Sequence, residues 1–283
     1  NIKLFRQGPK DIRLNDTKIS QKELIGTLNT VIFCPEDLQL IKGTPSGRRR
    51  FLDMEISQTS ATYYHQLMQY NRLLQQRNAV LKEYRGKQNI PLEEWDLQLA
   101  DMASFIVKKR LESLKKINLL IDLMNRKLTG GLENLTIGYE QSYMDNGSLE
   151  YTKEGFYERI KAALPQDRHR LTTSVGPHRD DLRFFSDAMD LKKFGSQGQQ
   201  RTAVLSLKLS ELEFIKSEVG EYPVLLLDDV LSELDESRRA NLLQFIHKRI
   251  QTFITTTDIH DFKDLKSVQF ISCEGGKVQY GQP

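Results

Sequence analysis

The sequence lacks the features that mark secreted proteins and membrane-spanning proteins. Its 283 residues include only two cysteines, Cys34 and Cys273, too few for a disulfide framework or a cluster of metal ligands. The longest strongly apolar run, residues 224–227, is far too short to cross a bilayer, and no charged-then-apolar signal segment opens the chain. We therefore expect a soluble protein of the reducing cytoplasm with no membrane association.

The sequence also lacks an excess of charge of one sign. Its 41 Lys and Arg residues nearly balance 38 Asp and Glu residues, which leaves a net charge of +3. Any affinity for nucleic acid must then come from local patches of charge. Hydrophobic residues make up 39% of the chain, which is ordinary for a globular protein and excludes a mainly disordered or fibrous one. The length suits one large domain or two of average size.

Two long segments in the first half predict helices. Residues 57–84 contain neither Gly nor Pro and place apolar residues at heptad positions, with Arg77 as the one polar exception. Residues 92–128 repeat this pattern after a break at residues 86–91. At 1.5 Å per residue, these helices reach about 42 and 55 Å. A short break between two long helices predicts an antiparallel arm.

A strand with two acidic residues at its end follows in the second half. Residues 224–227 are continuously apolar, which is typical of a strand in the middle of a covered sheet, and Asp228 and Asp229 come directly after it. From about residue 166 onward, short strands alternate with helices, which favours a parallel sheet. Ligands bind at the carboxyl ends of such strands, where carboxylates can hold Mg²⁺. Alone, two such acids more often start a solvated loop.

A glycine-containing loop, GSQGQQ at residues 195–200, opens another predicted helix. Free backbone N–H groups at a helix N-terminus favour an anion such as phosphate. The simpler interpretation is an ordinary helix start with Ser196 as the capping residue. With 27 residues between Gly198 and Leu225, the loop and the acidic strand together are hard to explain as coincidence.

Together these segments resemble a known group of proteins, the ABC-type ATPases. GSQGQQ resembles their signature motif, VLLLDD at 224–229 their Walker B strand, SELD at 232–235 their D-loop, and TTTD at 255–258 occupies the switch-loop position. Within that group the chain most closely resembles the RecF recombination mediators. The matching segments cover nearly the whole chain: FCPEDL (33–38), GTPSGRRRFLD (43–53), SVGPHRDD (174–181), FGSQGQQR (194–201) and LLLDDVLSELD (225–235).

The resemblance implies an α/β fold in which an ABC-type ATPase lobe carries an inserted helical antiparallel arm. We expect residues 1–47 to form the β-rich remainder of an N-terminal ATPase lobe. Residues 48–165 then form the helical insertion, and residues 166–283 form the C-terminal ATPase lobe. In this family, ATP lies between two subunits, so the homodimer depends on ATP.

The resemblance also assigns roles to individual residues. Asp228 would support Mg²⁺, and Asp229 would be the general base. Many ABC relatives have Glu there, and because the shorter Asp would hold water less closely, we expect slow turnover. Ser196, Gln197, Gly198 and Gln199 would bind the ATP held by the partner subunit. Asp235 would line the dimer interface, and Thr257 would occupy the switch position.

The expected function is that of an ATP-gated clamp at the junctions of gapped DNA. It helps to load a recombinase in DNA repair, recombination, replication restart and the SOS response. The family partners are RecO, RecR and RecA. Arg48, Arg49 and Arg50 are candidates for contacts with DNA phosphates, although a basic triplet is usually a solvated helix start.

One departure from the family concerns the P-loop, GxxxxGK[ST], which this sequence lacks. Residues 43–47 are no substitute, because Arg48 follows where Lys and Ser or Thr are needed. We expect the chain to lack roughly the first quarter of a RecF-like protein, to bind ATP poorly and to hydrolyse none, whereas the full-length protein is a slow DNA-dependent ATPase. Two alternatives are an SMC- or RecN-like ATPase, with a much longer coiled coil, and a non-catalytic scaffold that docks repair partners.

Overall fold

The architecture was obtained as a computed structural model that describes residues 1–6, 8, 10–87, 89–131, 133–141, 151–258, 262 and 268–281. A parallel three-stranded sheet holds the acidic strand at its centre. Its order is β4 (Thr30–Phe33), β8 (Val224–Asp228) and β9 (Thr252–Thr255). Val31 pairs with Leu225, and Leu225 pairs with Thr252. The predicted central position of the apolar strand is therefore confirmed.

A second sheet is antiparallel, in the order β5 (Leu135–Glu140), β6 (Asp181–Ser186) and β7 (Met189–Asp190). The pairing of β4 with β8 joins the predicted N-terminal lobe (residues 1–47) to the predicted C-terminal lobe (residues 166–283). The pairing of β5 with β6 joins the predicted helical insertion (residues 48–165) to the same C-terminal lobe. The predicted division at residues 47 and 165 stays a prediction, but strand pairing crosses both of its boundaries.

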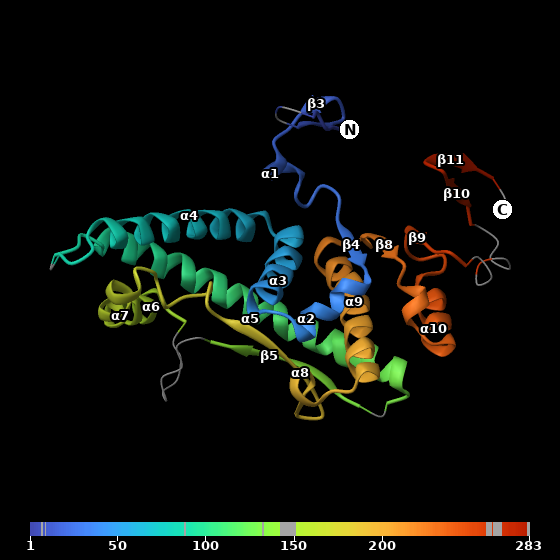
Figure 1. Ribbon diagram of the computed structural model, residues 1–283. Helices are drawn as coiled ribbons and strands as arrows, with labels where there is room; N and C mark the ends of the chain where they lie inside the picture. The colour runs from blue at the N-terminus through green and yellow to red at the C-terminus, as the bar shows by residue number, and fades with distance from the viewer. Residues whose placement is uncertain are drawn as a thin grey trace.

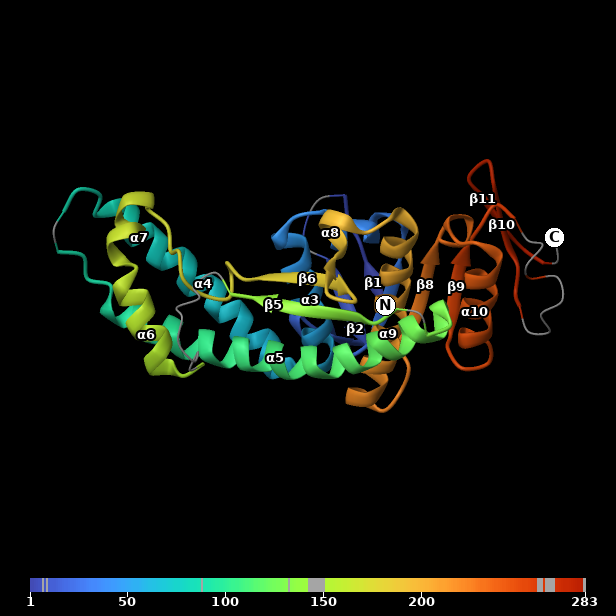
Figure 2. The ribbon, with the colours of Figure 1, turned by 90° about the horizontal axis from the view of Figure 1, so that it is seen from below.

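The arm consists of two long helices, α4 (Ala61–Glu83) and α5 (Glu93–Thr129), which lie side by side and antiparallel (Figures 1 and 2). The prediction of a single first helix from residue 57 to 84 was wrong at its start. A separate helix, α3 (Pro45–Thr59), ends at Ser60, whose side chain accepts a hydrogen bond from the backbone N–H of Tyr63 at 3.2 Å and caps α4. Two shorter helices, α6 (Lys153–Ala162) and α7 (Leu164–Arg170), cover the far half of the arm (Figure 2).

The polar exception in the predicted heptad, Arg77, is completely buried in the arm. Its Nε donates to Asp96 Oδ1 and its Nη1 to Asp167 Oδ2, both at 2.6 Å, and Nη1 also donates to Thr173 Oγ1. Arg77 therefore joins α4, α5 and α7 through paired charges in the interior.

Helix α9 (Gln197–Val219) forms the centre of the ATPase-like half. It packs against α5, and most of its residues from Gln200 to Ile215 are buried, because it is covered on all sides. Short elements surround it or lie beside the parallel sheet: η1 (Pro35–Leu38), α2 (Gln39–Lys42), α8 (Leu191–Phe194), η2 (Leu231–Glu233) and α10 (Glu236–Ile246).

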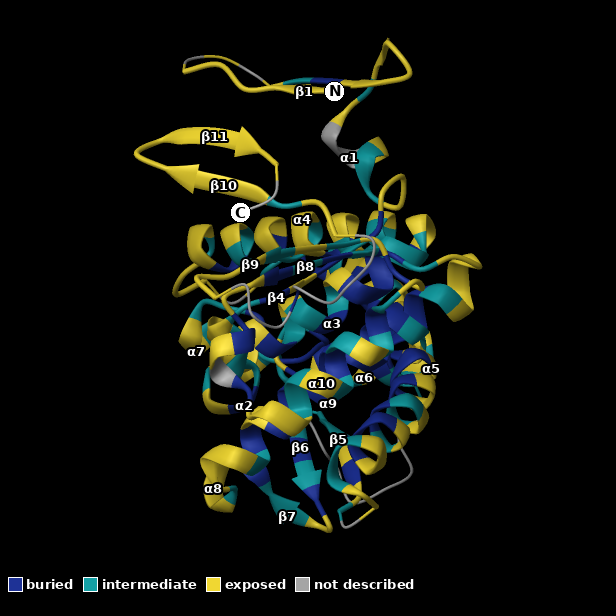
Figure 3. Ribbon diagram, turned by 90° about the vertical axis from the view of Figure 1, so that its right-hand side faces the viewer, coloured by how far each residue is buried: buried dark blue, intermediate teal, exposed yellow. Residues whose placement is uncertain are grey.

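Two small hairpin structures project from this body near the chain ends, and Figure 3 shows them as largely exposed. The first contains β1 (Ile2–Lys3), β2 (Asp11–Leu14) and β3 (Thr17–Lys18), and the short helix α1 (Gln21–Leu24) follows it. The second pairs β10 (Ile271–Glu274) with β11 (Lys277–Tyr280). Within the described residues, no helix is both long enough and apolar enough to span a bilayer.

Candidate nucleotide-binding site

The two aspartates of the predicted Walker B strand lie at the carboxyl end of β8, and both are exposed. Thr255, at the end of the neighbouring strand β9, contacts both of them. Its hydroxyl donates to Asp228 Oδ1 at 2.6 Å and accepts from the backbone N–H of Asp229 at 3.0 Å. Asp229 has a φ of 52°, a left-handed conformation that is uncommon for a residue other than Gly and occurs at functional sites.

This strand end fits a magnesium ion by the chemistry of its donors. Carboxylate and hydroxyl oxygens are ligands that Mg²⁺ accepts, and Asp228 presents a carboxylate to solvent beside the Thr255 hydroxyl. Within the described residues, no group of three or more His, Cys, Asp or Glu side chains could enclose a metal by itself. Asp228 is therefore suited to an ion that keeps water or phosphate among its other ligands.

The predicted signature residues form the N-terminus of α9. Ser196 Oγ accepts from the backbone N–H of Gln199 at 3.2 Å, and Gln199 Oε1 accepts from the backbone N–H of Ser196 at 3.0 Å, so the two residues form a capping box. Gln199 Nε2 also donates to Glu133 Oε1 at 3.0 Å. The simpler interpretation of Ser196 as a helix cap is therefore correct, and it leaves Gln197 and Gly198 exposed in the first turn.

The two glycines of this loop, Gly195 and Gly198, differ in whether the surrounding chain leaves space for a side chain. A Cβ on Gly195 would lie 2.6 Å from the carbonyl oxygen of Leu191, so the packing of the chain itself excludes a side chain there. A Cβ on Gly198 would meet nothing closer than Ser196 Oγ at 3.9 Å. Gly in a helix costs about 1 kcal/mol relative to Ala. The bare backbone at Gly198 therefore suits something that approaches from outside the chain.

The other predicted site residues lie on separate elements. Asp235 caps α10, where its Oδ1 accepts from the backbone N–H of Arg238 at 2.9 Å, and about half of its side chain is exposed. Thr257 is exposed after β9. Among the described residues, no hydrogen bond joins the signature loop to Asp228 or Asp229. The signature motif lies at the start of α9, whereas the Walker B-like acids lie at the end of β8, on a separate element.

A buried cluster of charges connects the helix that starts at the signature loop to η1. Lys208 Nζ lies 3.3 Å from Asp37 Oδ1 and 3.3 Å from Glu211 Oε1, and Glu55 of α3 is buried close to this amine. Burial lowers the pKa of Lys208, but the surrounding carboxylates outweigh this effect and raise it above its ordinary value. Burial raises the pKa of Glu55 to about 7, and it raises the pKa of Glu211 well above the ordinary range.

The predicted DNA-contact triplet is divided by the structure. Arg48 is 3% exposed, and its Nε and Nη2 each donate to the carboxylate of Asp181 at 2.8 Å. It faces the interior and presents no donor to a phosphate, so the expectation for Arg48 is corrected. Arg49 is half-buried, whereas Arg50 is exposed and has no ion-pair partner among the described residues.

Sequence reasoning missed Thr255, because it assigned the switch position to Thr257, the third residue of the TTTD segment. A run of three threonines gives no indication of which hydroxyl faces the aspartates. The pairing of Asp228 with Thr255 across β8 and β9 decides this, because it places the first threonine directly beside the acid.

Comparison with known proteins identifies the family. A scan against protein-family models gave no match. The chain is 48% identical over 268 residues to "DNA replication and repair protein RecF" of Alkaliphilus oremlandii, which covers 94% of this chain and 73% of that protein. It is 46% identical over 279 residues to the protein of the same name from Clostridium botulinum (strain Eklund 17B / Type B), which covers 97% of this chain and 76% of that protein.

Solved structures agree with these relatives. One described as the recombination mediator protein RecF-ATPrS in the RecFOR pathway superposes with a TM-score of 0.88 and 37% identity, and the match covers 99% of this chain and 75% of that one. A second, described as RecF-ATP in the same pathway, gives a TM-score of 0.87 at 37% identity. The α/β fold with an ABC-type ATPase lobe and an inserted helical arm is therefore confirmed. The chain belongs to the RecF family of DNA replication and repair proteins.

Proposed function

We propose that this protein acts in DNA repair and replication as an ATP-dependent recombination mediator of the RecFOR pathway. ATP would hold two copies together as a clamp at the junctions of gapped DNA, where the clamp helps to load the recombinase RecA with RecO and RecR. The relatives described as ATP-bound RecF support the nucleotide, and family membership supports the pathway.

The observation that carries the dimeric part of this proposal is the separation of the two halves of the site. The signature loop at the start of α9 and the acids at the end of β8 share no hydrogen bond among the described residues, yet each presents exposed groups suited to phosphate or to its magnesium ion. Gly198 leaves backbone open to an external partner. A second copy of the chain would supply the missing half of each site.

In this arrangement the residues of one chain have separate tasks. Ser196, Gln197, Gly198 and Gln199 bind the γ-phosphate of ATP held by the other copy, since a helix N-terminus favours an anion. Asp228, held by Thr255, supports the Mg²⁺ that neutralises phosphate charge.

The remaining residues complete the reaction and the interface. Asp229 orients the attacking water and accepts its proton, and its side chain is one methylene shorter than Glu, which gives a slow ATPase. Asp235 lies at the contact between the two copies, and Thr257 takes the switch position. Arg50 is the member of the triplet best exposed for a DNA phosphate.

The test uses two substitutions at the signature cap in full-length protein. Ser196→Asp keeps a good helix cap but places a carboxylate where the γ-phosphate is expected, so it should abolish ATP-dependent dimerisation. Ser196→Thr keeps both the cap and a neutral hydroxyl and is the matched control, which should still dimerise. Analytical ultracentrifugation with and without ATP and Mg²⁺ gives the readout, and thermal melting checks that both variants fold.

Two outcomes contradict the proposal in different ways. If the Ser196→Asp variant dimerises at the same ATP concentration as the unaltered protein, the signature loop does not bind ATP. Equal dimerisation of the unaltered protein with and without ATP would instead favour a scaffold whose assembly does not need nucleotide.

A further inference from the structure

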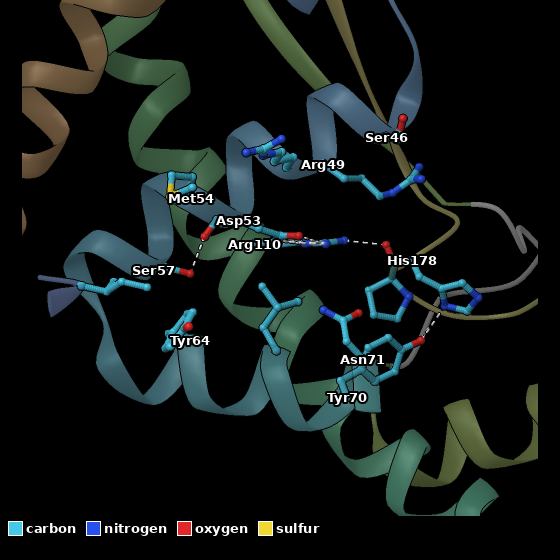
Figure 4. A pocket seen from close by; sticks show the side chains of 14 residues that line it. Ser46, Arg49, Asp53, Met54, Ser57, Tyr64, Tyr70, Asn71, Arg110 and His178 are labelled. Atoms are coloured by element: carbon cyan, nitrogen blue, oxygen red, sulfur yellow. Dashed lines mark hydrogen bonds and ion pairs between the residues drawn. The ribbon is translucent and has the colours of Figure 1, made fainter. Parts of the chain in front are cut away.

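Two segments outside the predicted ATPase motifs, GTPSGRRRFLD (43–53) and SVGPHRDD (174–181), meet at one cavity. The cavity has a volume of about 410 Å³ and lies between α3, α4 and the loop at Pro177 and His178 (Figure 4). Ligand pockets usually have volumes of roughly 300–1,000 Å³. This one is large enough for a small organic ligand, and it lies on elements distinct from those of the candidate ATP site.

The residues of the inner wall of the cavity are hydrogen-bonded to one another. Arg110 donates from Nε and Nη2 to the carboxylate of Asp53, both at 2.9 Å, and from Nη1 to the carbonyl oxygen of Pro177 at 2.7 Å. Tyr70 Oη and His178 Nδ1 lie 2.6 Å apart. A dashed line marks this contact in Figure 4. Because these groups bind each other, the wall is preorganised, which lowers the entropic cost of binding.

The backbone of this loop lies close against the side chain of Tyr70. Gly176 has a φ of +133°, and a Cβ at this position would lie 2.3 Å from Tyr70 Oη. Burial lowers the pKa of His178 to about 4, so its imidazole is neutral at pH 7 and adds no charge to the wall.

Two arginines, Arg49 and Arg50, line the cavity, and among the described residues no carboxylate forms an ion pair with either of them. Arg49 Nη1 donates to the carbonyl oxygen of Asp180 at 2.6 Å, and within the described residues its Nε and Nη2 donate to no other group. Arg50 makes no hydrogen bond or ion pair with the described residues and is exposed. Three carboxylates interact electrostatically with Arg49, and each of them also binds another group. Asp53 binds Arg110, Asp180 accepts a hydrogen bond from Tyr139, and Asp181 binds Arg48.

The rest of the lining is mainly apolar, with a few hydrogen-bonding groups. Met54, Tyr64 and Leu67 supply apolar and aromatic surface, and Asn71 and Ser46 supply an amide and a hydroxyl. Arg guanidinium groups bind phosphate in a bidentate manner, and aromatic side chains stack on nucleobases. The guanidinium donors of Arg49 and Arg50 therefore suit a phosphate, and the apolar lining with the Asn71 amide suits a planar aromatic ring attached to it.

We propose that this cavity binds one nucleotide unit, with its phosphate on Arg49 and Arg50 and its base against Met54, Tyr64 and Leu67. The unit has two sources with the same chemistry, a free mononucleotide or one nucleotide of a single DNA strand. This site does not depend on the ATP-held dimer, because all of its residues belong to one chain.

The test titrates the protein with deoxyadenosine 5′-monophosphate by isothermal calorimetry without Mg²⁺ or ATP. Deoxyadenosine and inorganic phosphate are titrated separately, and each should bind at least about tenfold more weakly, because each has one half of the ligand. Arg50→Ala should weaken binding of the nucleotide about tenfold, since it removes a charge-assisted contact. Arg85→Ala, an exposed arginine in the turn after α4, removes the same charge elsewhere and should leave binding unchanged.

Three outcomes would overturn the proposal. They are no binding of the nucleotide at millimolar concentration, equal binding by Arg50→Ala and the unaltered protein, and an equal loss in Arg85→Ala, which would show charge attraction without a site. A (dT)5 oligonucleotide distinguishes the two sources. Tighter binding than thymidine monophosphate, lost in Arg50→Ala, indicates a strand of DNA, whereas weaker binding indicates a free mononucleotide.

Separate variants test the two proposals of this article. Ser196→Asp should still bind the mononucleotide in this cavity, and Arg50→Ala should still dimerise with ATP. A failure of one proposal therefore leaves the other open to its own test.

Discussion

The buried cluster around Lys208 predicts that stability falls as pH rises from 4.5 to about 7. Glu55 is buried, and its Oε2 has no hydrogen-bond partner among the described residues. The charged groups that face it are Lys208 on α9 and Asp37 on η1, with Glu211 bound to the same amine. Three carboxylates and one amine therefore share one interior site.

The sign and size of the effect follow from the pKa of Glu55, which burial raises from 4.5 to about 7. Between these values the Glu55 side chain binds a proton in the folded protein and releases it in the unfolded chain. The contribution of Glu55 to stability therefore falls as pH rises from 4.5 to 7 and is constant above 7. At about 1.4 kcal/mol for each pH unit, the total loss is about 3 kcal/mol.

Glu55→Gln removes this titration and keeps a side chain of the same shape. At pH 5 the variant and the unaltered protein should have similar free energies of unfolding, and at pH 8 the variant should be more stable by about 3 kcal/mol. Urea unfolding at intervals between pH 5 and 9 measures the difference. Glu221→Gln, on an exposed loop before β8, is the control and should show no pH-dependent difference. Parallel pH curves for Glu55→Gln and the unaltered protein would refute the assignment of the proton to this site.

Three further predictions concern Arg77, Gly176 and Cys34. Arg77→Met leaves its two carboxylate partners without their cation and should lower the free energy of unfolding by about 3–5 kcal/mol in urea. Gly176→Ala should displace Tyr70 and lower the melting temperature by several degrees in a thermal melt, and an unchanged melting temperature would contradict the close contact. Burial and then Asp37 raise the pKa of Cys34 to about 11, so iodoacetamide at pH 8 should alkylate it much more slowly than the exposed Cys273, as peptide mass spectrometry would show.

Local patterns in the sequence predicted the arm and the central strand, because each depends on periodicity within one segment. A continuous apolar run followed by acids identified β8, and two segments with heptad spacing identified α4 and α5. The break at Ser60 gave no such signal, since neither Gly nor Pro marks it. The cap that Ser60 forms with Tyr63 is visible only in the folded backbone.

Long-range partners were beyond prediction from the sequence. Arg77 was expected only to interrupt the apolar stripe, but its partners lie 19 and 90 positions away, and their convergence depends on how α7 folds back on the arm. Arg48 and Arg50 look alike in the sequence, yet one pairs with a carboxylate 133 positions away and the other faces solvent. No local pattern separates them.

The continuity of α9 and β8 has a consequence for communication between two nucleotides. The helix is about 34 Å long, and only four residues separate its end at Val219 from the start of β8 at Val224. The signature loop therefore lies at the start of this helix–strand segment, and Asp228 and Asp229 lie at its end. In the proposed dimer these ends face different ATP molecules, so a shift imposed by one nucleotide would move the acids that serve the second. The two hydrolysis events would then be mechanically coupled within each chain as well as across the interface.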